Sequence, residues 1–129
     1  MSGTYETGQM VTGIYKTGKY AGEIIDVNRA KTSYVVKVLA VIKHPTQGDL
    51  HNPQSVNVPL FHERKALSYM EKANIPAPYI KPYDGEIPEY KKSLAEALSI
   101  QKDDLVKMNN EWADKSLESL RSLEKDYFK

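Results

Sequence analysis

Apolar and polar residues alternate with a period of two through the first third of the chain, a pattern that is typical of β-strands. We expect strands over residues 10–15, 20–27 and 34–42, and a short last strand over residues 56–58. Gly18, in the turn Lys16-Thr17-Gly18-Lys19, predicts a tight hairpin because glycine readily adopts positive φ. The segment 34–42 is apolar on both faces except at Lys37, so we place it centrally, covered on both sides.

In the second half of the chain the spacing of apolar residues changes to three and four, which predicts helices. The first helix would cover residues 61–72, and a connector that holds four of the seven prolines would follow over residues 76–88. Pro88 suits the first turn of a second helix with one apolar face. Asp103 or Asp104 would cap a last helix.

These elements predict an α+β fold in which a small β-barrel precedes C-terminal helices. A few short, curved strands cannot cover both faces of a flat sheet, and closing them into a barrel removes their exposed edges. The barrel would take residues 1–60 and the helical part residues 61–129, packed together as one cooperative domain. A chain of 129 residues is long enough for one such domain.

The composition is that of a soluble globular protein, with 40% hydrophobic and 27% charged residues. The net charge of +1 gives no bulk field that would recruit nucleic acid or an acidic membrane. The lack of cysteine excludes disulfides, thiolate metal sites, cysteine nucleophiles and cysteine-linked lipid anchors. The N-terminus does not resemble a secretory signal, and the longest apolar stretch, within residues 34–42, is too short to span a bilayer. We therefore expect a cytoplasmic protein without direct membrane insertion, for which any membrane attachment would be through a partner.

One motif comes close to a phosphate-binding loop. Gly13-Ile14-Tyr15-Lys16-Thr17-Gly18-Lys19-Tyr20 fits the G-x-x-x-x-G-K pattern, but Tyr20 stands where a Ser or Thr would ligate magnesium. The residues that follow alternate as a strand, where a helix N-terminus would have to receive the phosphate. A hairpin explains both glycines, so we expect no nucleotide cofactor.

Three histidines raise the alternative of a metal site. His44, His51 and His62, with Asp49 between the first two, could supply ligands for zinc or another divalent ion. Their spacing matches no established ligand pattern, and we favour hydrogen bonds within a turn instead. The serines fall in neither a G-x-S-x-G nor an S-x-x-K pattern, and no nucleophile–base pair is recognisable. We therefore predict a non-enzymatic protein with no catalytic residues, no metal and no cofactor.

A nucleic-acid-binding barrel is the main alternative to a protein-binding one. Aromatic and basic residues interleave on the β half of the chain, at Tyr15, Lys16, Lys19, Tyr20, Arg29, Lys31 and Lys37. Such rings can stack on bases while the cations follow phosphates, as in RNA-binding barrels. The alternative is a purely structural role, in which the tyrosines pack across strands and the lysines protect the sheet edges from pairing with another chain. A homodimer is also open, because the apolar stripe that includes Trp112 either packs on its own domain or forms an interface.

Four segments are specific enough to point to a family. They are Thr12-Gly13-Ile14-Tyr15-Lys16-Thr17-Gly18-Lys19-Tyr20 with Gly22-Glu23, then Tyr34-Val35-Val36-Lys37-Val38-Leu39-Ala40-Val41 running into His44-Pro45-Thr46-Gln47-Gly48-Asp49-Leu50-His51-Asn52, then Val58-Pro59-Leu60-Phe61-His62-Glu63-Arg64-Lys65-Ala66-Leu67, and Gly85-Glu86-Ile87-Pro88-Glu89-Tyr90 with Ser93-Leu94. Together they resemble the kinase-associated protein B family of spore-forming bacteria, in order and over nearly the whole chain.

The resemblance implies a regulatory protein needed by a membrane sensor histidine kinase that feeds the phosphorelay initiating sporulation. Its partner would be this kinase or a protein of its pathway. It also implies an SH3-like barrel followed by helices. The family is sometimes described as a lipoprotein, whereas this chain has no cysteine to carry a lipid. The resemblance brings no catalytic residues and no mapped binding residues.

The site prediction therefore depends on the residue pattern. The loop 44–52 is long and polar for a connection in a small barrel, and such loops often carry function on a rigid scaffold. We predict that the partner-binding residues are His44, Gln47, Asp49, His51, Asn52, His62 and Arg64. The alternative is that this loop plugs the end of the barrel and docks the helices.

Overall fold

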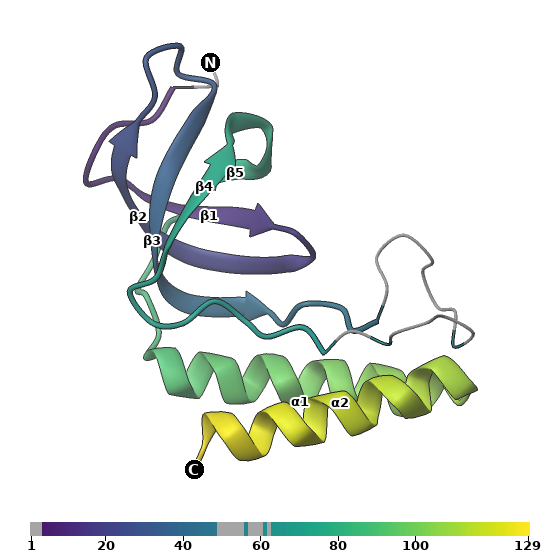
Figure 1. The fold of residues 1–129 in the computed structure, drawn as a ribbon. Helices are drawn as coiled ribbons and strands as arrows, with labels where there is room; N and C mark the ends of the chain where they lie inside the picture. Colours follow the sequence, from purple (N-terminus) through teal and green to yellow (C-terminus); the bar gives the residue numbers. More distant parts are fainter. Residues whose placement is uncertain (1–3, 49–55, 57–60, 62) are drawn as a thin grey trace.

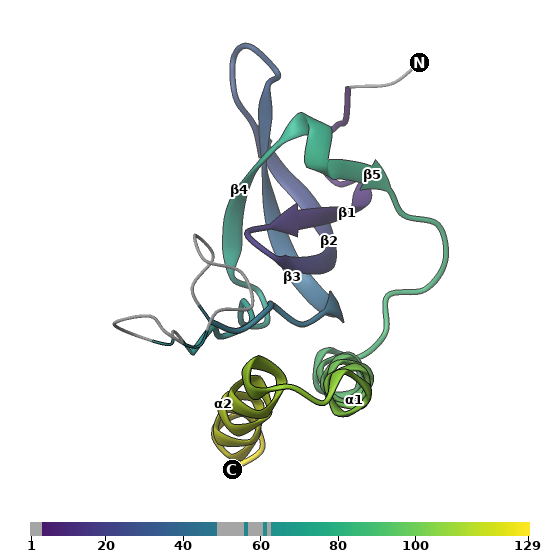
Figure 2. The ribbon, with the colours of Figure 1, turned by 90° about the vertical axis from the view of Figure 1, so that its right-hand side faces the viewer.

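The computed structural model describes residues 4–48, 56, 61 and 63–129 of the chain. A five-stranded antiparallel sheet is followed by two helices, so the α+β class is confirmed. The elements in chain order are β1 (Met10–Tyr15), β2 (Gly18–Val27), β3 (Ser33–Lys43), β4 (Lys72–Pro76), the 3-10 turn η1 (Ala77–Tyr79), β5 (Ile80–Pro82), α1 (Tyr90–Met108) and α2 (Glu111–Tyr127). The two helices form a layer on one side of the sheet, and the C-terminus lies in that layer (Figures 1 and 2).

The sheet has the order β4-β3-β2-β1-β5, in which β5 returns to pair with β1. The long strands β2 and β3 shift register at three places, and such irregularities bend and twist a strand pair. The curvature brings β1 close to β4, since a Cβ atom on Gly13 would lie 2.7 Å from Cδ1 of Ile75. The hydrogen-bonded order of the described strands ends at β4 and β5, so the closed, SH3-like barrel stays a prediction.

Two apolar clusters hold these layers together. The first lies within the curl of the sheet and contains Val11, Ile24, Tyr34, Val36, Ala73, Ile75 and Ile80. The second lies between the sheet and the helices and contains Tyr20, Val38, Val41, Ala66, Leu94, Ala97, Leu98, Leu105, Trp112, Ala113, Leu117 and Leu120. The predicted stripe around Trp112 is therefore packed on its own chain. Along β3 one face is buried and the other is half-buried, so the predicted cover on both faces holds only in part.

The helix predicted over residues 61–72 is wrong. The described residues 63–68 have no regular secondary structure, and Met70 has a φ of 70°, which a helix does not tolerate. The chain then enters β4, whose burial alternates with the period of two expected of a strand. The change from sheet to helix therefore falls between Pro82 and Tyr90 rather than near residue 60. Of the strand expected over residues 56–58, only residue 56 lies within the described part of the chain. Folding of the sheet and helices as one cooperative domain stays a prediction.

The cap predicted for the last helix is also wrong. Asp103 and Asp104 lie inside α1, which continues to Met108 and ends at Asn109 with a left-handed φ of 49°. Asn110 caps α2 instead, because its side-chain oxygen accepts a hydrogen bond from the Ala113 amide at 2.7 Å. A left-handed residue followed by an N-cap is what makes this short turn between two antiparallel helices possible.

The hairpin between β1 and β2 forms as predicted, although Gly18 is not its positive-φ residue. That conformation falls on Lys16, with a φ of 56°, while Gly18 is the first residue of β2 and pairs with Tyr15. A Cβ atom on Gly18 would lie 2.5 Å from the hydroxyl oxygen of Tyr20. Glycine is therefore required there to leave room for the Tyr20 ring.

Candidate functional site

His44 is a fully buried residue that links the end of β3 to α2. Its Nδ1 lies 3.1 Å from the Pro45 carbonyl and its Nε2 lies 2.9 Å from the Tyr127 hydroxyl. The same hydroxyl accepts a hydrogen bond from the Ala66 amide at 2.8 Å. The donors balance when Nδ1–H donates to Pro45 and the Tyr127 hydroxyl donates to Nε2, which assigns a neutral imidazole.

The electrostatics of this junction agree with a neutral imidazole. Burial lowers the pKa of His44, and the polar groups of Pro45 and Gln101 that face the ring act in the opposite direction. Burial also raises the pKa of Tyr127, so its hydroxyl keeps the proton that it donates. His44 therefore connects three segments through neutral hydrogen bonds and carries no charge to offer to a partner at neutral pH.

Gln47 makes a second connection between the same segments. Its Oε1 accepts from the Arg64 amide at 2.8 Å, and its Nε2 donates to the Arg64 and Pro45 carbonyls at 2.9 and 3.0 Å. Arg64 returns a hydrogen bond from its Nε to the Gly48 carbonyl at 3.1 Å. These contacts hold the segment after β3 against the segment before β4, as a pair of strands would.

The predicted partner-binding residues thus divide into two groups. His44, Gln47 and Arg64 lie together, and the polar atoms named above serve the packing of the loop against α2 and the segment before β4. This arrangement supports the alternative in which the loop docks the helices. Asp49, His51, Asn52 and His62 lie outside the described residues, so partner binding by this loop stays a prediction.

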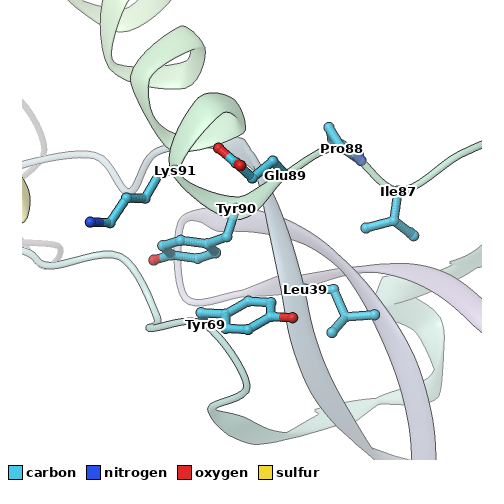
Figure 3. A pocket seen from close by; sticks show the side chains of 7 residues that line it. All are labelled: Leu39, Tyr69, Ile87, Pro88, Glu89, Tyr90 and Lys91. Carbon is cyan, nitrogen blue, oxygen red and sulfur yellow. The ribbon is translucent and has the colours of Figure 1, made fainter.

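A pocket that the residue pattern did not indicate lies where β3 meets the start of α1. It has a volume of about 570 Å³ and is lined by Leu39, Tyr69, Ile87, Pro88, Glu89, Tyr90 and Lys91. Figure 3 shows the rings of Tyr69 and Tyr90 next to each other, with Leu39 beside them. The ring centroids are 5.8 Å apart. We call this the tyrosine pocket.

The two tyrosines have different roles in this pocket. The hydroxyl of Tyr90 donates a hydrogen bond to the Leu67 carbonyl, which holds the ring in one position, and burial raises the pKa of this hydroxyl. Tyr69 is 57% exposed and provides apolar ring surface to solvent. Glu89 and Lys91 bring charges of both signs to the rim. A fixed ring, a free ring and a half-buried Leu39 are suited to binding an apolar side chain of another protein.

The structure bears on two alternatives from the sequence, a metal site and nucleic-acid binding. Among the described residues no group of three or more His, Asp or Glu side chains is placed to hold a metal ion, while Asp49, His51 and His62 fall outside that part. For nucleic acid, the buried Tyr20 has no ring face free for stacking on a base, since its hydroxyl accepts from the Leu67 amide. Lys37 is engaged with Glu23 at 3.5 Å.

Comparison with known proteins decides the family. Residues 15–128 match the family described as KapB, Kinase associated protein B. The chain belongs to the kinase-associated protein B family. It is 53% identical over 125 residues to Kinase-associated lipoprotein B of Bacillus subtilis (strain 168), and this alignment covers 97% of this chain and 96% of the relative. It also matches the crystal structure of kinase-associated protein B from Bacillus cereus, with a TM-score of 0.80 and 45% identity over 96% of this chain and 98% of that chain.

These matches confirm the family resemblance that the four sequence segments indicated. The word lipoprotein belongs to the name of the Bacillus subtilis relative, and none of the 129 residues of this chain is a cysteine. Neither α1 nor α2, the helices of the described part, is long and apolar enough to cross a membrane.

Proposed function

We propose that this chain controls a membrane sensor histidine kinase of the phosphorelay that initiates sporulation, and that it acts by protein contact rather than by catalysis. The observation that carries the proposal is membership of the kinase-associated protein B family over nearly the whole chain. The lack of a recognisable nucleophile–base pair in the sequence supports a non-enzymatic role. Attachment to the membrane is then indirect, through the kinase.

The tyrosine pocket is the docking surface that we assign to this contact. Aromatic residues carry much of the binding energy at protein interfaces because they bury a large area with few rotatable bonds. Tyr90 is already fixed by its hydrogen bond, so the ring of Tyr90 loses little conformational entropy when a partner covers the exposed Tyr69 beside it. The opposite charges of Glu89 and Lys91 at the rim can set the orientation of the partner.

The test combines a genetic and a binding measurement. Deletion of the gene lowers the spore count in strains that depend on the associated kinase, and the wild-type chain restores it. The variant Tyr69→Ala binds the cytoplasmic part of that kinase about tenfold or more weakly than wild type, as expected for an aromatic anchor. Tyr79→Ala is the matched control, because Tyr79 is 53% exposed and does not line this pocket.

The outcomes separate the parts of the proposal. Unchanged spore counts in every kinase background after deletion contradict the sporulation role. Equal binding by the Tyr69 and Tyr79 variants contradicts the docking surface, and a loss caused instead by alanine at Asp49 and His51 together, with the buried His44 kept, assigns contact to the loop 44–52. Salt-dependent retention on single-stranded RNA would favour the nucleic-acid alternative.

A further inference from the structure

A second pocket lies further along α1, toward its C-terminal half, between the end of β3, the segment that follows it, and both helices. Its volume is about 380 Å³, and its lining residues are Ile42, Lys43, Thr46, Gln47, Ala97, Ile100, Gln101, Asp104, Leu105, Met108, Trp112 and Ser116. It shares no lining residue with the tyrosine pocket. We call it the helix pocket.

Two side chains of the helix pocket have buried polar atoms without hydrogen-bond partners. The Oγ of Ser116 and the Oε1 of Gln101 have none among the described residues, and Ser116 is 0% exposed. A helical serine usually bonds to a carbonyl one turn earlier, as Ser93 does to Tyr90 at 2.8 Å. Most buried polar side-chain atoms find a partner, so two unsatisfied atoms at one pocket require an explanation.

The chemistry of these two atoms is defined. The Nε2 of Gln101 donates to the His44 carbonyl at 3.1 Å, which fixes the orientation of the amide and leaves Oε1 as the unpaired acceptor. The hydroxyl of Ser116 supplies a donor. One unpaired acceptor and one unpaired donor match the backbone of a single residue, which has one N–H and one C=O.

The rest of the pocket favours a neutral, apolar occupant. Most of the lining beside the two polar atoms is apolar, and Ile100 and Met108 expose 61% and 40% of their side chains. Lys43 and Asp104 bring one charge of each sign, so there is no field that would select an ion or a nucleic acid. A volume near the lower end of the range for ligand sites fits a short piece of polypeptide.

We propose that the helix pocket receives an apolar residue of a partner polypeptide. The backbone N–H of that residue donates to Gln101 Oε1, and its C=O accepts from the Ser116 hydroxyl. Both atoms are covered in the free protein, so the rim must open, and the unbranched, adaptable side chain of Met108 permits this. The proposal does not depend on a kinase being the partner.

The minimal probe is N-acetyl-leucine methylamide, which contains one apolar side chain between two peptide groups. The chain has a single tryptophan, and Trp112 lines the helix pocket, so its emission reports occupancy. We expect a saturable change with a Kd of about 1 mM or weaker, as befits one residue. No saturable change up to the solubility limit of the probe would overturn the proposal.

Ser116→Ala gives the most specific signature. Removing an unpaired buried hydroxyl should leave the thermal midpoint unchanged or raise it, while the affinity for the probe falls by about 3- to 10-fold. Ser122→Ala, at an exposed serine on the same helix, should change neither quantity. A Ser116 variant that binds the probe as well as wild type contradicts the assigned hydrogen bond.

A second pair of variants places the probe in the pocket without disturbing the core. Ile100→Lys puts a charge on the rim and should weaken binding at least about tenfold. Val106→Lys is its control, because Val106 is 62% exposed on the same helix and does not line the pocket. If sedimentation instead shows a wild-type dimer that Ile100→Lys dissociates, and no probe binds, a second copy of the chain is the occupant and the proposal is wrong.

Discussion

The hydroxyl of Tyr127 contacts both His44 and Ala66 and so joins the segments around His44, which makes Tyr127→Phe a sharp test of this junction. The substitution keeps the ring, which packs edge-on against His44 with centroids 5.8 Å apart. It removes only the oxygen that accepts from the Ala66 amide at 2.8 Å and contacts His44 Nε2 at 2.9 Å. Any loss of stability therefore measures those two hydrogen bonds.

The magnitude follows from the burial of both partners. Each hydrogen bond contributes about 1 kcal/mol net, and leaving a buried group unpaired adds its desolvation cost. Ala66 and His44 are both buried, and no other hydrogen bond of the Ala66 amide or His44 Nε2 is found among the described residues. We expect the free energy of unfolding to fall by about 2–4 kcal/mol, a large part of the roughly 5–15 kcal/mol typical of a domain.

Urea unfolding followed by circular dichroism measures this loss as a lower midpoint with an unchanged m-value. In a thermal scan the same change lowers Tm on the order of 10 °C. Tyr79→Phe is the control, because the exposed Tyr79 hydroxyl makes no hydrogen bond to a described residue. If both variants lose the same stability, the hydroxyl of Tyr127 does not hold the junction and the argument fails.

Three further predictions concern the stability of the fold. Burial lowers the pKa of His44, so the unfolded chain binds more protons than the folded chain below about pH 6.5. The contribution of His44 to stability should be fully present above that pH and fall below it, by at most about 1.4 kcal/mol per pH unit. His44→Gln should reduce this slope in urea titrations at successive pH values. Gly22→Ala should lower the free energy of unfolding by about 2–3 kcal/mol or more, because the added Cβ would overlap the rigid Lys37 carbonyl. Gly13→Ala meets only the end of the Ile75 side chain and should cost less. Equal unfolding midpoints for the two variants would contradict this ranking. Asn110→Ala should lower the free energy of unfolding by about 1 kcal/mol through loss of the α2 cap. Asn109→Gly, at a left-handed position, should be neutral or slightly stabilising. The reverse ranking in thermal scans would contradict the assignment of Asn110 as the cap.

The N-terminal strands could be predicted because their signal is local. In β1, β2 and β3 the alternation of side chains matches the buried face, and the hairpin is short. β4 could not be predicted, since its five residues end in Pro76 and continue an apparently helical spacing. What makes this segment a strand is the free edge of β3, where residues from Ser33 to Lys37 pair with it. That edge is a tertiary feature, and it overrides local preference.

The site was harder to predict than the fold for a similar reason. His44 and Gln47 attract attention by residue type, yet their role depends on Tyr127 and Arg64, which are distant in sequence. Tyr69 and Tyr90 form one pocket only because the turn before β4 and the start of α1 meet in space. Within the segment 85–90 the sequence indicated only a helix start at Pro88 and the family resemblance, not a pocket. Residue chemistry thus indicated candidates, and only the packing showed which side chains remain accessible.

The position of β5 has a consequence for synthesis of the protein. β1 and its partner β2 are both made early, but the other edge of β1 is filled by Ile80–Pro82, which the ribosome adds much later. Until then the nascent chain presents an unpaired strand edge to its surroundings, where another chain could add by backbone pairing. Translation pauses before residue 82 should therefore increase aggregation of the emerging chain more than pauses after it.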